Sequence, residues 1–416
     1  MKKVALALGL LAGFTGTMLA QEGAVPTGIP HLDHVFVIMM ENHGYREILG
    51  NGNAPFINSY AKTANLANNY FAVAHPSLTN YLEVVGGSNF GVHSDNNPDW
   101  HSGTCATNLS NGSVNTDNPS SPDICPVWGS GTDAATPVFD CTNEVTGPPC
   151  EVNLDGIAWY PAVKTTLGIT IADQLVTAGL SWKTYQESLP MSGPDGVDYS
   201  DGNFTNNTNF SKIYPPQNPP LNSGEIVQLY ASKHNPFVYF SNIEAGTNPL
   251  LSYAQMAAFD GVGGLWGDLA SGHVPSYSYI VPNQCNDQHG RGNGTAFCGY
   301  DPNDNGSQAG LNPALIQLGD QALQKIVTAI HASPAWRRCR AAIVTVWDEN
   351  DYAVQPIYNK VVTIVDTNYG SQQLQSKTFY THFSLLRSIE GGFGIPCLNH
   401  ACDANTNTMS DLFGQP

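Results

Sequence analysis

The sequence predicts an α/β fold with a mostly parallel central sheet. Two runs, 34–40 (HVFVIMM) and 341–347 (AAIVTVW), are almost continuously apolar and of strand length. Runs of this kind are typical of strands buried on both faces of a parallel sheet. Segments with helical spacing of apolar residues lie between strand-like segments. This alternation is expected where helices connect parallel strands.

The remaining elements follow the same alternation. Thr170 is a suitable N-cap for a helix over 171–178, and the glycines after 390 favour the end of another helix. The expected helices are 171–178, a segment around 323–330, and 381–390. The expected further strands are 181–186, 236–243, 277–281 and 360–365.

Composition and the N-terminal segment indicate an exported protein. Residues 1–20 have the pattern of a signal peptide, with Lys2 and Lys3 before an apolar run and Ala20 at a suitable cleavage point. No later segment approaches the ~20 apolar residues of a membrane span. The 34 acidic residues outnumber 16 basic ones, which argues against nucleic-acid binding. We expect a secreted or periplasmic protein with no integral membrane segment after cleavage, in which 21–416 form one domain.

Nine cysteines in an exported chain predict disulfides. The segment 89–164 has no strand or helix periodicity and contains four of these cysteines, so we interpret it as a loop-rich insertion stapled by disulfides. Cys339 is left over when neighbours in sequence are paired. The expected pairs are Cys105–Cys125, Cys141–Cys150, Cys285–Cys298 and Cys397–Cys402.

Acidic residues directly follow both long apolar runs. Glu41 and Asn42 follow the first, and Asp348 and Glu349 follow the second. In open α/β sheets, ligands bind beyond the carboxyl ends of the strands. Carboxylate and amide oxygens are hard ligands that suit a divalent metal ion. The alternative interpretation is that these are solvated acids in turns.

Ser77 follows Pro76 and precedes apolar residues at 78, 81, 82 and 85, the spacing of one helix face. A serine here is placed at a helix N-terminus, where free N–H groups bind anions. Asn80, one turn later, projects to the same side. The simpler interpretation is a capping serine without a further role.

The loop 283–290 (NQCNDQHG) adds Asp287 and His289. A hydroxyl nucleophile, donors for phosphate oxygens, acids and a histidine are what phosphoryl transfer through a covalent intermediate requires. A metal ion beside Ser77 would lower the pKa of its hydroxyl and hold the phosphate.

Five sequence blocks carry a resemblance to a known family. They occur in order along the chain: 38–45 (IMMENHGY), 75–81 (HPSLTNY), 182–187 (WKTYQE), 345–349 (TVWDE) and 380–390 (YTHFSLLRSIE). Together they resemble the phosphoesterase family, which contains secreted bacterial acid phosphatases and non-haemolytic phospholipases C. The resemblance implies a three-layer alkaline-phosphatase-like fold and a divalent metal cofactor.

The resemblance also implies roles for individual residues. Ser77 matches the nucleophile, Asn80 a phosphate ligand, and His289 a histidine that assists the leaving group. The acidic metal or active-site positions are matched by Glu41, Asn42, Asp348 and Glu349. Glu349 departs from the pattern, because some members carry Asp there.

Three further residues have two interpretations each. Asp287 orients His289 or caps a turn. His75 reaches the site or is a structural histidine. His382 supports the Asp348 side of the site or packs in the core.

These observations favour an exported hydrolase of phosphoric esters that acts through a phosphoserine at Ser77. The expected type is an acid-phosphatase-like phosphomonoesterase with a small phosphate ester as substrate, because the 89–164 insertion is mainly polar. One alternative is a phospholipase C that cleaves phosphatidylcholine and recognises a phospholipid headgroup. Another is a non-catalytic exported binding protein with the same fold.

Overall fold

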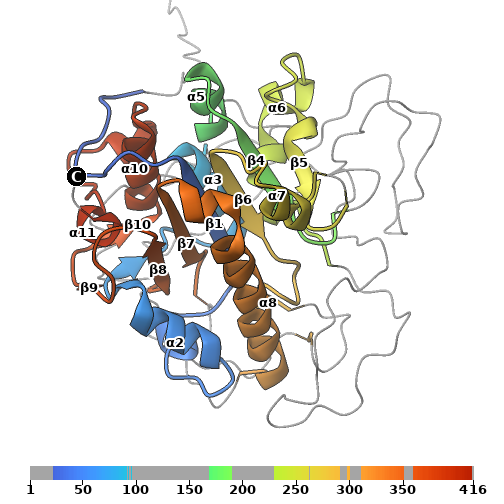
Figure 1. Cartoon of the computed structure of the whole chain (residues 1–416), viewed down its shortest axis with the longest axis vertical. Coiled ribbons are helices and arrows are strands. Elements are labelled where there is room, and N and C mark those ends of the chain that lie inside the picture. Colours follow the sequence, from blue (N-terminus) through green and yellow to red (C-terminus); the bar gives the residue numbers. More distant parts are fainter. Residues whose placement is uncertain are drawn as a thin grey trace, which may run out of the picture.

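An eight-stranded sheet with strand order β5-β4-β6-β1-β7-β8-β2-β9 forms the centre of the protein (Figure 1). The computed structural model describes residues 22–90, 92, 95, 168–189, 229–261, 263–290, 298–299, 311–350 and 359–414. β1 (His34–Met40) lies in the middle of the sheet, between β6 (Tyr277–Val281) and β7 (Ala341–Trp347). β1 and β7 are the two apolar runs, and both are buried as predicted.

The sheet is mixed but mostly parallel. β5 (Met256–Ala258), β4 (Trp182–Gln186), β6, β1 and β7 run parallel to one another. β8 (Thr363–Thr367) is antiparallel to β7 and to β2 (Asn65–Ala67), and β9 (Gln375–Ser376) is parallel to β2. β3 (Tyr70–Phe71) and β10 (Tyr380–Thr381) form a separate parallel pair.

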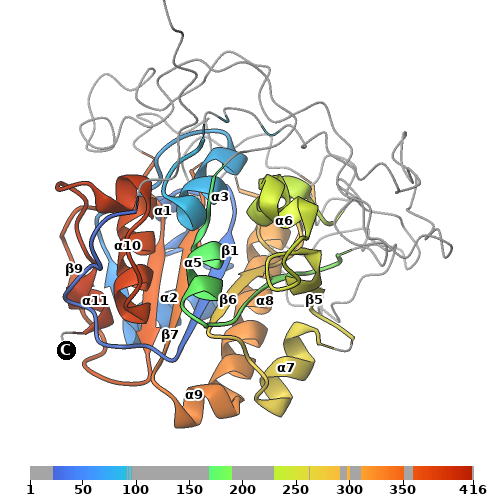
Figure 2. The ribbon, with the colours of Figure 1, turned by 90° about the horizontal axis from the view of Figure 1, so that it is seen from above.

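Helices cover both faces of the sheet, which confirms the predicted α/β fold (Figure 2). α3 (Ser77–Gly86), α5 (Ile171–Thr177) and α10 (His382–Phe393) lie together on one face. α2 (Pro55–Thr63), α7 (Leu265–Ser271) and α8 (Pro313–Ala332) lie together on the other. The shorter helices are α1 (Tyr45–Ile48), α6 (Ser241–Ala245), α9 (Pro334–Arg338), α11 (Ser410–Phe413), and the 3-10 turns Ser232–His234, Pro236–Tyr239, Tyr253–Gln255 and Asn399–Cys402.

Several predicted elements are confirmed with small shifts. Thr170 caps α5, accepting a hydrogen bond from the Ala172 N–H, and Asp173 completes a capping box. α8 contains the helical segment predicted around 323–330. β8 begins at Thr363 instead of 360.

The predicted strand over 236–243 is wrong. This segment forms a 3-10 turn followed by α6. The ring of Phe237 packs 4.6 Å from the Trp182 ring and 5.6 Å from the Tyr279 ring, centroid to centroid. Phe237 is thus buried against residues of β4 and β6 without pairing as a strand. A run of residues with high strand propensity therefore does not form a strand here.

The helix predicted over 381–390 is longer than expected. α10 continues through Gly391 and Gly392 to Phe393, and ends at Gly394 with a left-handed φ of 68°. A Cβ on Gly392 would lie 2.7 Å from the Leu32 side chain. This glycine therefore permits close packing inside the helix and does not terminate it.

Helix α3 also differs from its expected amphipathic pattern. All its residues, from Ser77 to Gly86, are buried, because α10 and α5 cover the side away from the sheet. The helix that begins at Ser77 is thus held on every side.

Two predicted disulfides are present, Cys285–Cys298 and Cys397–Cys402, and Cys339 is a free thiol. The pairs Cys105–Cys125 and Cys141–Cys150, the signal peptide 1–20 and most of the 89–164 insertion lie outside the described residues. Among the residues that the structure describes, no helix combines the length and apolar character needed to cross a membrane.

Candidate active site

The site lies where three adjacent parallel strands end. The loops after β6, β1 and β7 are joined by main-chain hydrogen bonds: Glu41 N–H donates to Asp287 O (2.8 Å), and Asp348 N–H donates to Met40 O (2.9 Å). Residues separated by about 300 positions in the sequence are therefore fixed at one edge of the sheet. This is the edge at which α/β proteins bind ligands.

Ser77 is the first residue of α3, and its hydroxyl faces two carboxylates. Ser77 Oγ lies 3.2 Å from Glu41 Oε2 and 3.2 Å from Glu349 Oε1. The side chain is nearly inaccessible to solvent, at 2% exposure. A hydroxyl has one proton, so it donates to one of these carboxylates at a time. The structure thus brings Ser77 together with an acid from each of the two predicted strand ends.

Asn80 fixes the chain before Ser77. Its Oδ1 accepts hydrogen bonds from the Val73 and Ala74 N–H groups, both at 3.1 Å. Its amide nitrogen donates to Ala74 O (2.7 Å) and to Glu349 Oε2 (3.2 Å). Both amide protons are engaged, so the predicted contact with a phosphate oxygen requires one of these bonds to be exchanged.

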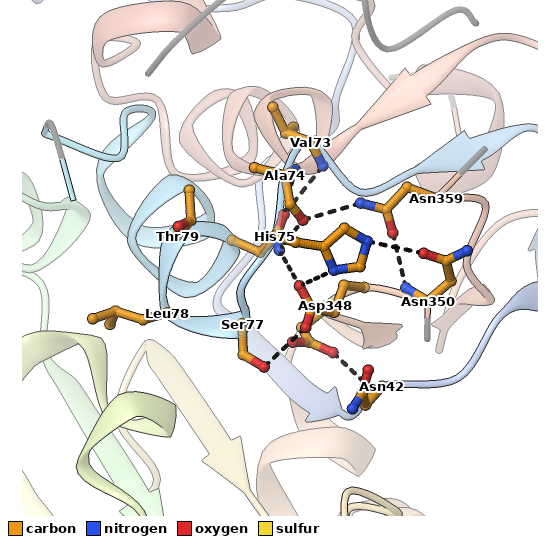
Figure 3. A network of polar contacts seen from close by, with 12 residues as sticks. Asn42, Val73, Ala74, His75, Ser77, Leu78, Thr79, Asp348, Asn350 and Asn359 are labelled. Carbon is orange, nitrogen blue, oxygen red and sulfur yellow. Dashed lines mark hydrogen bonds and ion pairs between the residues drawn. The ribbon is translucent and has the colours of Figure 1, made fainter. Parts of the chain in front are cut away.

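Asn42 and Asp348 are linked through the main chain. Asn42 adopts a left-handed φ of 57°, and its N–H donates to Asp348 Oδ1 at 3.0 Å (Figure 3). The second oxygen, Asp348 Oδ2, is buried and accepts no hydrogen bond within the described part of the chain. A buried acceptor of this kind is available to a cation, a water molecule or a shared proton.

His382 supports the Asp348 main chain. Its Nε2 donates to Asp348 O (2.7 Å), and its Nδ1 faces the Tyr70 hydroxyl (3.0 Å). Burial lowers the pKa of His382 to about 4, so the ring is neutral near pH 7. A carbonyl only accepts, which places the ring proton on Nε2 and leaves Nδ1 to accept from Tyr70.

His75 is a buried histidine in contact with the site. Its Nδ1 lies 2.8 Å from Glu349 Oε2, and its Nε2 lies 3.1 Å from Asn350 Oδ1. Figure 3 shows the ring on the loop that leads into α3, beside Asn350 and Asn359. His75 orients Glu349, the carboxylate that also faces Ser77.

His234 belongs to the site but was absent from the sequence-based set. Its Nε2 lies 2.9 Å from Glu41 Oε1 and its Nδ1 lies 3.2 Å from Asp287 Oδ2. The ring stacks on Tyr81 of α3 with a centroid distance of 5.2 Å and an interplanar angle of 9°. A 3-10 turn positions it. The only local sequence feature that could have indicated a functional role for His234 is the Lys-His pair just before the segment 236–243.

Asp287 does not orient the His289 ring. Its Oδ1 accepts from the main-chain N–H of His289 (2.7 Å), and its Oδ2 faces His234. The His289 ring is fixed instead by Gly290 O, 2.7 Å from Nδ1, which places the proton on Nδ1. The other nitrogen, Nε2, faces Lys233 Nζ at 3.1 Å.

Buried carboxylates dominate the electrostatics. Burial raises the pKa of Glu41 from 4.5 to about 7, and Lys233 only partly opposes this. Burial and neighbouring carboxylates also raise the pKa values of Asp287, Asp348 and Glu349. The four groups together need positive charge or shared protons.

Lys233 supplies one positive charge. Burial alone would lower the pKa of its ammonium, but Asp95, Glu41 and Glu349 raise it above the ordinary value. Lys233 Nζ donates to Asp95 Oδ2 at 2.9 Å.

The residues fit a divalent metal ion. Ligand atoms of Glu41, His234 and His289 lie within 4.8 Å of one another, and all three side chains are buried. Carboxylate and imidazole ligands suit zinc, manganese or iron. Asp348 Oδ2 adds a buried acceptor. Of the predicted ligands Glu41, Asn42, Asp348 and Glu349, only Glu41 belongs to this three-residue cluster.

Comparison with known proteins identifies the family of the chain. The model of the phosphoesterase family matches residues 51–297. The chain belongs to the phosphoesterase family. The predicted resemblance is therefore confirmed, although the matched range begins after Glu41 and ends before Asp348.

Two relatives illustrate the range of the family. An acid phosphatase of Aspergillus fumigatus is 22% identical over 89% of this chain and 57% of its own length. A phosphatidylinositol-3-phosphatase of Mycobacterium tuberculosis is 22% identical over 98% of this chain and 92% of its own. This chain thus spans little more than half of the fungal relative.

Solved structures are more distant. A protein of the alkaline phosphatase superfamily from Vibrio parahaemolyticus is 10% identical, covers 90% of this chain and 70% of its own, and has a TM-score of 0.44.

Proposed function

We propose that the protein hydrolyses phosphoric monoesters by transferring the phosphoryl group to Ser77 and then to water. The observation that carries this proposal is the contact of the Ser77 hydroxyl with Glu41 and Glu349 at the start of a helix. Membership of the phosphoesterase family and the phosphatases among the relatives support it.

The first step is removal of the Ser77 proton. Glu41 and Glu349 are each within reach of the hydroxyl. A carboxylate that a metal ion holds in its charged form is a weak base, so Glu349, which lies outside the metal cluster and whose pKa is raised by burial, is the candidate to accept the proton. The serine oxygen then attacks phosphorus, and the bond to the leaving alkoxide breaks.

The second requirement is stabilisation of the phosphoryl oxygens and of the leaving group. The Leu78 N–H at the start of α3 and the Lys233 ammonium, which contacts His289, are the candidate donors. The role expected for His289, assistance to the leaving group, stays a prediction, because its Nδ1 proton is held by Gly290 O and its Nε2 faces Lys233 Nζ.

Glu41, His234 and His289, with Asp348, would hold a divalent metal ion. Bound there, it would supply Lewis-acid stabilisation of phosphoryl charge and lower the pKa of the serine hydroxyl. Asn80 and His75 hold Glu349 in place, and His382 holds the Asp348 main chain. The predicted roles of Asn42 and of Glu349 as metal ligands stay predictions.

We also propose that the protein acts outside the cytoplasm, where the disulfides Cys285–Cys298 and Cys397–Cys402 are stable. A phosphoinositide monophosphate is a second candidate substrate. It is favoured by the Mycobacterium tuberculosis relative, which aligns over 92% of its own length.

Turnover of three substrates separates these possibilities. We expect hydrolysis of p-nitrophenyl phosphate, abolished in Ser77→Ala and retained in Ser59→Ala, a matched control at an exposed serine of α2. Faster hydrolysis of phosphatidylinositol 3-phosphate would assign the lipid substrate, and cleavage of phosphatidylcholine would assign the phospholipase C alternative. Wild-type turnover by a folded Ser77→Ala protein would reject the nucleophile.

A further inference from the structure

Asp95 contacts both helix α3 and Lys233, and neither the motifs nor the mechanism above gives it a role. Its two oxygens have different partners. Oδ1 accepts from the Leu78 N–H of α3 at 3.1 Å, and Oδ2 accepts from Lys233 Nζ at 2.9 Å. The carboxylate thus bridges a helix N-terminus and a lysine.

These two donors are also the groups that a phosphoryl ligand needs. Leu78 directly follows the nucleophile Ser77, so its N–H belongs to the first turn of α3, where free N–H groups bind anions. Lys233 Nζ contacts His289 Nε2 at 3.1 Å, which places the ammonium on the histidine side of the site. The Asp95 carboxylate accepts from the Leu78 N–H with one oxygen and from the Lys233 ammonium with the other, as two oxygens of a phosphoryl group would.

Asp95 differs from the other acids of the site in its exposure. Its side chain is 35% exposed, whereas Glu41 and Asp348 are fully buried. It can leave its donors without opening the core. Two anions cannot use the same N–H and the same ammonium together, because their charges repel each other at this distance.

We propose that Asp95 is an internal competitor for the phosphate subsite, displaced when a phosphoryl group binds and returning when phosphate leaves. This inference rests on the proposed function and deepens it. Asp95 sets the affinity for substrate and product, and it takes no part in bond making or breaking. Its return to Leu78 and Lys233 assists the release of inorganic phosphate.

The test is the equilibrium affinity of the full-length protein for inorganic phosphate, measured by titration calorimetry with the metal content determined in each sample. We expect Asp95→Ala and Asp95→Asn to bind phosphate about two- to fivefold more tightly than wild type, the range for loss of one partly exposed charged contact. KM for p-nitrophenyl phosphate should fall in parallel, with kcat changed less. Asp260→Asn, at an exposed aspartate after β5, is the matched control for loss of one charge.

The outcomes separate this inference from the function itself. Unchanged or weaker phosphate binding in both folded Asp95 variants overturns the competitor role and assigns Asp95 to positioning Lys233. A large fall in kcat with unchanged phosphate affinity also overturns it and indicates an acid catalyst. If wild type neither binds phosphate nor hydrolyses phosphoric esters, the proposed function fails first.

Discussion

The raised pKa of Glu41 makes the stability of the metal-free protein depend on pH. Glu41 has a pKa of about 7 in the folded protein and its ordinary value of 4.5 when unfolded. Between these values the folded state binds more protons than the unfolded state. By linkage, the free energy of unfolding therefore falls as pH rises through this window.

The magnitude follows from the size of the shift. A shift of about 2.5 pH units at about 1.4 kcal/mol per unit gives a loss of about 3 kcal/mol between pH 4 and pH 8 from Glu41. Asp287, Asp348 and Glu349, whose pKa values are raised in the same direction, add to this loss. A divalent ion bound to these carboxylates offsets it, because it stabilises their charged form.

The assay is urea unfolding of chelator-treated protein at several pH values, with and without added zinc or manganese. We expect the metal-free protein to lose stability as pH rises, the Glu41→Gln variant to lose less, and added metal to flatten the dependence. A metal-free wild type whose stability is constant or increases from pH 5 to pH 8 would refute the reasoning about the buried carboxylates.

Of two further predictions, the first concerns His234, a residue of the site that the sequence did not predict, and the second concerns the stability of helix α5. His234→Gln removes the contact with Glu41 and one candidate metal ligand, so we expect about 100-fold lower kcat/KM and weaker metal retention, measured by elemental analysis. The control is His331→Gln, at a half-exposed histidine paired with Asp366. Equal effects of the two substitutions would contradict the assignment of His234 to the site. Thr170→Ala removes the cap of α5 and should cost about 1 kcal/mol in urea unfolding; no measurable loss would show that the cap contributes nothing.

The strands that position the site could be predicted from the sequence because of how they are buried. β1 and β7 are covered on both faces, so each is a continuous apolar run that ends abruptly in acids. Ser77 was found because a helix N-terminus has a local pattern. The acids that follow β1 and β7, Glu41 and Glu349, both contact the Ser77 hydroxyl oxygen, because these strands lie side by side and parallel in the sheet.

The part of the site that was missed depends on tertiary contacts alone. His234, Lys233 and Asp95 approach from segments without strand or helix periodicity, and nothing local distinguishes them from surface residues. The aromatic run after His234 was assigned to a strand because its burial against the sheet resembles burial within one.

The central claim, covalent transfer to Ser77, is tested most directly by acid quenching of the enzyme during turnover of p-nitrophenyl phosphate, followed by peptide mass spectrometry. We predict a phosphorylated peptide that contains Ser77, with the phosphate on that residue, and no such peptide from the Ser77→Ala protein. Rapid turnover with an unmodified Ser77, or phosphate on a histidine of the site, would contradict the account.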